Sequence, residues 1–304
     1  MDDEQVFKEI GFSDRQSLNI GIRHPPFFSS TFNNNDNNIN YKQIFCYYLL
    51  TLLWTLLLTA IPIFANLPPK NYYPNHPGWY TGNDLMRLLE PIGGVPLNFL
   101  VFHSSGIFTR DLSVENMICI YVFIFATAVY GQGAGFHSAS NMFKNSLNTI
   151  WNGHDDALGN LNYYMYIVWE HEAGHYMYAA GYGLMNVCQL YAFKDHKIGL
   201  AGITRFVKVL LISCSIVGAL LIGGVAAEFP SGLIVGLVYL IVYGLMIVGG
   251  YVVYLYVNDP EERVFTCRPV LHYYLLSYCL ALLFVVIYIA VVGGFNNRKQ
   301  AGFR

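Results

Sequence analysis

Two histidines and two glutamates lie close together in one apolar segment, about residues 161–185: Glu170, His171, Glu172 and His175. An acid near the centre of a membrane helix costs at least about 2–3 kcal/mol on insertion scales. The segment contains no Lys or Arg that would neutralise these acids. The four side chains must therefore contact one another, a metal ion or water.

The order His171-Glu172-x-x-His175 is an HExxH pattern. Residues four apart lie on one face of an α-helix, so both imidazoles can bind a single Zn²⁺. Glu172 flanks that face, where it can take a proton from a water molecule and act as a general base. Two other interpretations remain open. The histidines could hydrogen-bond to Tyr or Asn side chains of neighbouring helices, or they could belong to a proton or ion pathway without a fixed metal.

A zinc site needs at least one further protein ligand, and His137 is the first candidate. It follows Gly131, Gly133 and Gly135, three glycines at alternate positions near the end of an apolar segment. Such glycines permit close packing of helices. We therefore expect His137 to approach the HExxH segment, with a hydrogen bond at the membrane interface as its alternative role.

Glu90 is the second candidate for the third ligand. It lies in a weaker apolar segment, about 85–108, and its alternative role is an ion pair with Arg87 three residues earlier. Asp155 and Asp156 lie in the connection before the HExxH segment and could close the site from above, or they could belong to a solvated loop.

The composition restricts the class of protein that carries these residues. Apolar residues make up 55% of the 304-residue chain and charged residues 12%, with a mean hydropathy of +0.39. A soluble domain usually has about twice that charged fraction. The net charge of −2 gives no basic surface for a polyanion. A soluble enzyme and a nucleic-acid-binding protein are therefore excluded, and the lipid bilayer is the expected partner.

A bilayer core of about 30 Å requires roughly 20 apolar residues in a helix. Seven segments meet this length, of which the second and fourth contain polar residues: 44–65, about 85–108, about 117–137, about 161–185, about 207–227, 233–257 and 270–294. The expected fold is an all-α, polytopic membrane helix bundle with about seven transmembrane helices.

The domain organisation follows from these segments. Residues 1–43 are polar and Asn-rich and are expected to form a disordered cytosolic tail. Residues 44–296 are expected to form the transmembrane helical domain, and 297–304 a short tail.

The orientation in the membrane follows from the positive charges. With seven spans, the 17 Lys and Arg residues divide eleven to six in favour of the N-terminal side. This bias predicts a cytosolic N-terminus. It also places Glu90, His137 and the HExxH segment in the same, non-cytosolic half of the membrane.

Two resemblances concern the metal-binding pattern itself. His171-Glu-Ala-Gly-His175, followed by Ala179 and Gly183, resembles the first metal motif of the site-2 intramembrane proteases, HExGH with a small residue and Gly at those offsets. The order Glu-His-Glu-x-x-His loosely resembles the metal-binding helix of ZIP-type zinc transporters. The first resemblance implies intramembrane proteolysis, and the second implies transient metal binding during transport.

A third resemblance concerns the architecture. Seven spans with histidine ligands from different helices are similar to the CREST superfamily of seven-helix membrane hydrolases. This resemblance implies hydrolysis of an amide or ester in a lipid. We therefore expect a zinc-dependent membrane hydrolase of a lipid or peptide, with a divalent-metal or proton-coupled transporter and a non-catalytic membrane protein as the alternatives.

Overall fold

The computed structural model describes residues 40–64, 82–110, 113–150, 156–196, 198, 203–227, 229, 232–258 and 268–296. The chain divides into two units, residues 1–36 and 37–304, and the described residues all belong to the second. The expectations for the Asn-rich tail before residue 40, for the tail at 297–304 and for Asp155 concern residues outside this description.

The described part of the chain is all-α and contains no strand. Its elements are α1 (Tyr41–Phe64), α2 (Gly82–His103), η2 (Ile107–Thr109), α3 (Val114–Ile150), α4 (Asp156–Tyr163), η3 (Tyr164–Gly174), α5 (His175–Ala192), α6 (Arg205–Ala227), α7 (Leu233–Asn258) and α8 (Pro269–Val292). The predicted fold class is confirmed. Each predicted span overlaps one long helix, or, for 161–185, the continuous run from α4 through η3 to α5.

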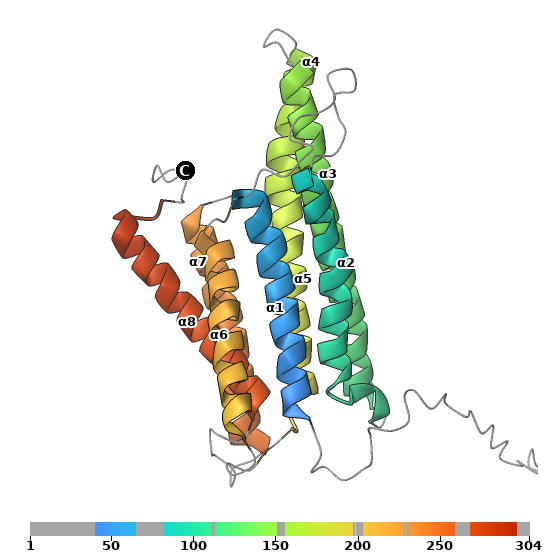
Figure 1. The fold of residues 1–304 in the computed structure, drawn as a ribbon, viewed down its shortest axis with the longest axis vertical. Coiled ribbons are helices and arrows are strands. Elements are labelled where there is room, and N and C mark those ends of the chain that lie inside the picture. Colours follow the sequence, from blue (N-terminus) through green and yellow to red (C-terminus); the bar gives the residue numbers. More distant parts are fainter. Residues whose placement is uncertain are drawn as a thin grey trace, which may run out of the picture. The chain divides into compact units, whose positions relative to one another are not determined.

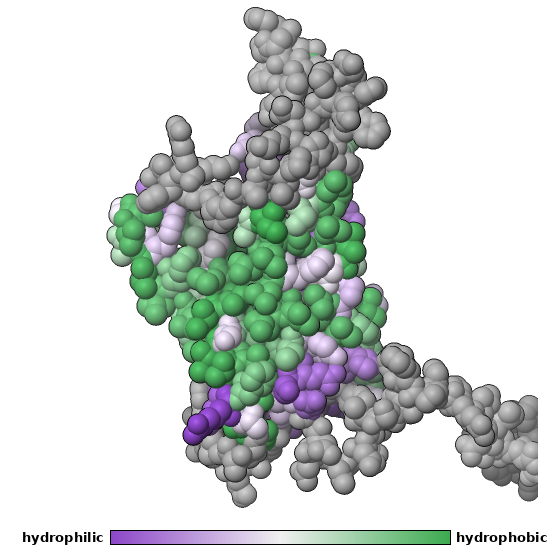
Figure 2. All heavy atoms as spheres, viewed as in Figure 1, coloured by the Kyte–Doolittle hydropathy of each residue, from purple (hydrophilic) through white to green (hydrophobic). Residues whose placement is uncertain are grey.

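Six of the described helices are long and apolar enough to cross a membrane: α1, α2, α3, α6, α7 and α8. Between α3 and α6, α4, η3 and α5 follow one another without a break and pack along α3 (Figure 1). Apolar side chains cover the middle of the described surface in the view of Figure 2. A helix satisfies its backbone hydrogen bonds internally, which is why such apolar sequences cross lipid as helices. The protein is therefore a multi-pass membrane protein.

The helices of the second unit pack in two groups. One contains α2, α3, α4, η3 and α5, and the other contains α6, α7 and α8. Helix α1 lies between them and packs extensively against both α2 and α6, whereas α5 makes only small contacts with α7 and α8 (Figure 1).

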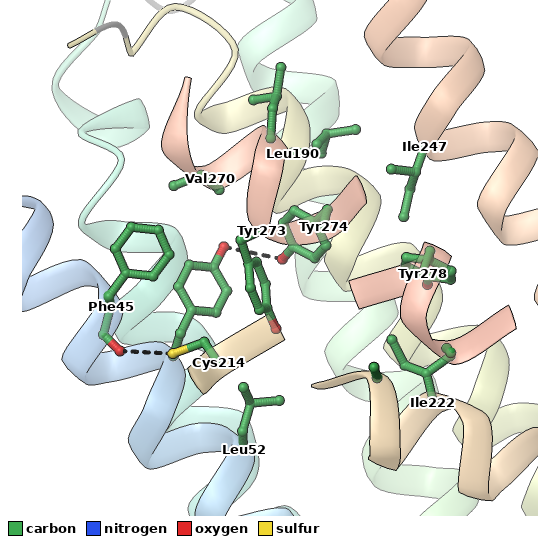
Figure 3. Close-up of a cluster of buried hydrophobic side chains, with 14 of the residues drawn as sticks. Phe45, Leu52, Leu190, Cys214, Ile222, Ile247, Val270, Tyr273, Tyr274 and Tyr278 are labelled. Atoms are coloured by element: carbon green, nitrogen blue, oxygen red, sulfur yellow. Dashed lines mark hydrogen bonds between the residues drawn. The ribbon is translucent and has the colours of Figure 1, made fainter. Parts of the chain in front are cut away.

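The largest buried cluster lies where α1, α6 and α8 meet (Figure 3). The rings of Tyr48 and Tyr273 are 4.5 Å apart between centroids. The Tyr48 hydroxyl donates to the Tyr274 hydroxyl at 3.2 Å, and the Cys214 thiol donates to the Phe45 carbonyl at 3.4 Å. The cluster fixes α1 against the second group of helices.

Candidate functional site

The HExxH segment has an unusual backbone conformation. Residues Tyr164–Gly174 form η3, a π-helix of 11 residues, and His175 begins α5. Glu170, His171 and Glu172 therefore lie in π-helical backbone. π-helices are rare, usually a single turn long, and frequent at functional sites.

Glycines bring α3 into backbone contact with α5. A Cβ atom on Gly133 would lie 2.4 Å from the backbone nitrogen of Tyr178, and one on Gly181 would lie 2.4 Å from the backbone nitrogen of Tyr130. Real Cβ atoms essentially never approach this closely. The absence of a side chain at Gly133 and Gly181 is therefore what allows the two helices to touch.

The same close packing brings three imidazoles together. A Cβ atom on Gly174 would lie 3.1 Å from the backbone nitrogen of His137, so α3 touches η3 at this level. The ring of His137 lies 4.7 Å from that of His175, and the His175 ring stacks on His171 at 5.5 Å and 14°. The Tyr166 ring meets His171 edge-on at 4.4 Å. His137 therefore lies next to the HExxH histidines.

The chemistry of these donors suits Zn²⁺, which binds imidazole nitrogen readily. The Nδ1 atom of His175 is buried and has no hydrogen-bond partner among the described residues. Leaving such an atom unsatisfied costs about 1–3 kcal/mol, which a bound ion would offset. In the part of the chain described, however, no group of three or more His, Cys, Asp or Glu side chains is arranged to hold a metal. Binding would require the imidazoles to turn about their side-chain torsions.

Glu90 has other partners. Its Oε1 atom accepts hydrogen bonds from the Tyr130 hydroxyl at 2.9 Å and from the Tyr178 hydroxyl. The indole of Trp54 donates to the Glu90 carbonyl at 3.1 Å. No ion pair joins Glu90 to Arg87 in the described structure. Glu90 thus links α1, α2, α3 and α5.

The remaining acids near the site differ in exposure. Glu170 is 5% exposed, whereas Glu172 is exposed. Asp84 is buried on α2 and accepts a hydrogen bond from the Asn141 amide at 3.2 Å. Asp156 is the exposed first residue of α4.

Three of these residues were not expected from the sequence, namely Tyr130, Tyr178 and Asp84. A signal did exist for Tyr130, because it shares a three- and four-residue spacing with Gly133, His137 and Asn141, which places all four on one face of α3. Asp84 is distinguished by its burial in the folded bundle.

A second polar network lies further along the bundle. The amide of Gln189, which is fully buried, donates to the Asn98 side-chain oxygen at 3.2 Å. Its oxygen accepts from the Tyr274 hydroxyl, which in turn accepts from the Tyr48 hydroxyl. Neutral polar groups of α1, α2, α5 and α8 are therefore connected.

Comparison of the chain with protein families, with curated proteins and with solved structures finds no match. The fold and the site together define a multi-pass, all-α membrane protein with adjacent histidines on two of its helices.

Proposed function

We propose that the protein is a zinc-dependent membrane hydrolase whose metal is bound by His137, His171 and His175. The observation that supports this proposal is the contact of three imidazoles from two helices at a π-helical segment. The chain contains no Leu-Asp-Gly sequence of the kind that supplies the second metal motif in site-2 proteases. The proposal therefore depends on the histidines and not on a family.

A bound Zn²⁺ would acidify a water molecule and polarise a substrate carbonyl. In the proposed reaction Glu172 takes a proton from the water and returns it to the leaving group. The water oxygen adds to the carbonyl carbon, the C–N or C–O bond breaks, and the products are a carboxylic acid and an amine or alcohol. Because the Glu172 side chain is exposed, the proposal requires it to turn towards the histidines.

The depth of the site favours a substrate that reaches it from the bilayer. His137 lies about 34 Å along α3 from Val114, so it is close to the boundary of a hydrocarbon core of about 30 Å. Trp169 and Tyr176 are 40% and 42% exposed on the same segment as the histidines. An amide or ester of a lipid or of a membrane peptide is therefore the proposed substrate.

Zinc analysis of the purified full-length protein tests the site. We expect near-stoichiometric zinc in the wild type and its loss in His171→Ala, His175→Ala and His137→Ala. His103→Ala is the matched control. His103 is the last residue of α2, and its ring contacts the rings of Phe99 and Phe108 and not the three histidines of the proposed site. Near-stoichiometric zinc in purified His171→Ala would refute the site, and a wild type without metal would favour a non-catalytic membrane protein.

The polar networks support a second candidate, a divalent-metal or proton-coupled transporter. Two polar networks lie in the same bundle as the histidines, one around Glu90 and one around Gln189, and an ion path would require such polar groups along its length. Uptake of Zn²⁺ into proteoliposomes that contain the protein, and its loss in His171→Ala, would favour transport over hydrolysis.

A further inference from the structure

Two buried cysteines meet near the start of α3 and the end of α5. Cys119 is 7% exposed and Cys188 is 4% exposed. The Cys119 thiol donates a hydrogen bond to the Cys188 carbonyl at 3.5 Å, and the two thiols are also hydrogen-bonded to each other. Both cysteines are free, and the proposed hydrolysis uses neither of them. Their two sulfur atoms therefore form a contacting pair outside the histidine site.

The packing of α3 against α5 explains why these two positions meet. A Cβ atom on Gly181 would lie 2.8 Å from the Ala126 carbonyl oxygen, which marks a point of backbone contact. Cys119 lies seven residues before Ala126 on α3, and Cys188 lies seven residues after Gly181 on α5. Seven residues make nearly two turns of an α-helix, so both cysteines remain on the faces in contact. The cysteine pair thus continues the glycine contact towards the ends of the two helices.

The pair is buried but lies close to the ends of its helices. Cys119 is five residues from the start of α3 and Cys188 is four residues from the end of α5, which is about 6–8 Å along each helix. Arg110 and Lys194 place positive charge near the Cys119 thiol. Reactive cysteines typically lie in electropositive surroundings. Because the pair is covered by side chains, a small uncharged oxidant such as a peroxide suits this position better than a bulky or charged one.

We infer that Cys119 and Cys188 form a reversible disulfide when the protein meets a peroxide. With hydrogen peroxide, the sulfur of one thiol attacks the O–O bond, and the products are a sulfenic acid and water. The sulfur of the other thiol then attacks the sulfenic sulfur, the S–O bond breaks, and a second water molecule leaves. The two thiols thus give two electrons and two protons to the peroxide, and a dithiol reductant reverses the reaction. This inference does not depend on bound zinc.

The orientation of the chain indicates when the disulfide would form. The Lys and Arg residues predict that this end of α3 and α5 lies on the cytosolic side, where thiols are kept reduced and disulfides are usually transient or redox-sensing. We therefore expect the reduced pair at rest and the disulfide after exposure to oxidant. The bond would join the two helices that carry His137 and His175, so that they could no longer separate at this end.

Counting the thiols of the full-length protein tests the inference. Protein in detergent is treated with hydrogen peroxide, then with catalase, denatured, and labelled with a maleimide–polyethylene glycol that shifts a gel band once for each thiol. We expect the wild type to lose two of its six thiols and to regain both with dithiothreitol. Mass spectrometry of a digest should find Cys119 and Cys188 in one linked peptide. Cys119→Ala and Cys188→Ala should not lose two thiols, whereas the control Cys279→Ala, at an exposed position on α8, should do so as the wild type does.

Retention of all six thiols by the wild type would overturn the inference, as would a linked peptide that contains another cysteine in place of either member of the pair. A loss of two thiols in Cys119→Ala would also overturn it. So would a loss that dithiothreitol does not restore, because that result indicates sulfinic or sulfonic acid and not a disulfide. If the alanine variants do not fold, Cys119→Ser and Cys188→Ser replace them with the same expectation, and the linked peptide of the wild type requires no variant.

Discussion

Glu90 shows how a carboxyl group is accommodated within a membrane span. Two tyrosine hydroxyls from different helices converge on one of its oxygens, and no lysine or arginine is bonded to it in the described structure. Hydroxyl donors can satisfy this oxygen in lipid without a second charge. The carboxyl side chain therefore connects α2, α3 and α5 in a way that a hydrocarbon side chain cannot.

Replacing Glu90 tests this connection. In Glu90→Gln the amide oxygen still accepts from Tyr130 and Tyr178, so we expect little change in stability. In Glu90→Leu both hydroxyls lose their acceptor, and a buried polar group left unsatisfied costs about 1–3 kcal/mol. Thermal unfolding in detergent should place Glu90→Leu well below Glu90→Gln. Equal stability of the two variants would show that the hydroxyls find other partners.

At the scale of elements, the contact between α3 and α5 depends on individual glycines. Gly131, Gly133 and Gly135 look alike in the sequence, but only Gly133 lacks room for a side chain. Around Gly131 and Gly135 a Cβ atom would meet nothing within 4 Å. The three positions should therefore respond differently to the same substitution.

We expect Gly133→Ala to destabilise the protein by about 1–3 kcal/mol, because its Cβ atom would force the two backbones apart. Gly131→Ala should be neutral or should stabilise the protein by about 0.5–1 kcal/mol, because alanine favours helix more than glycine does. Unfolding of both variants under the same conditions measures the difference. A Gly133→Ala protein as stable as Gly131→Ala would contradict the close contact.

The elements differ in how far the sequence predicts them. Uninterrupted apolar runs such as 44–65 and 270–294 correspond closely to α1 and α8, because in lipid a single apolar run can satisfy its backbone hydrogen bonds only as a helix.

Other features were not predicted. The π-helix of η3 is one of them, since the spacing of His171 and His175 fits an α-helix equally well. The partners of Glu90 were not predicted either, because they depend on which helices become neighbours. The juxtaposition of His137 and His175 has its sequence signal in the glycines before His137.

At the scale of the whole molecule, the number of crossings decides where each loop lies. The seven crossings predicted from the sequence would place the N-terminal end of α1 and the connection from α5 to α6 on one side, and the end of α8 on the other. The excess of Lys and Arg on the first side would make it cytosolic.

Labelling of single introduced cysteines with a membrane-impermeant maleimide checks this topology. We expect Asp195→Cys, in the turn after α5, to react from the same side as an N-terminal tag. Gly294→Cys, just after α8, should react only from the opposite side. Wild-type protein gives the background from the native cysteines. Labelling of Gly294→Cys on the side of the N-terminal tag would indicate six crossings, with the run from α4 to α5 failing to span the bilayer.

The position of α1 has a consequence for biosynthesis. This helix precedes both groups of helices in the chain, yet it is the one that packs extensively against each of them. It is therefore translated before the helices of both groups, and it remains in the bilayer beside α2 until α6 is translated. During that interval the tyrosine-rich side of α1 that later meets α6 and α8 faces lipid or the insertion machinery. The contacts of α1 with α6 and α8 therefore form only after these later helices have been translated.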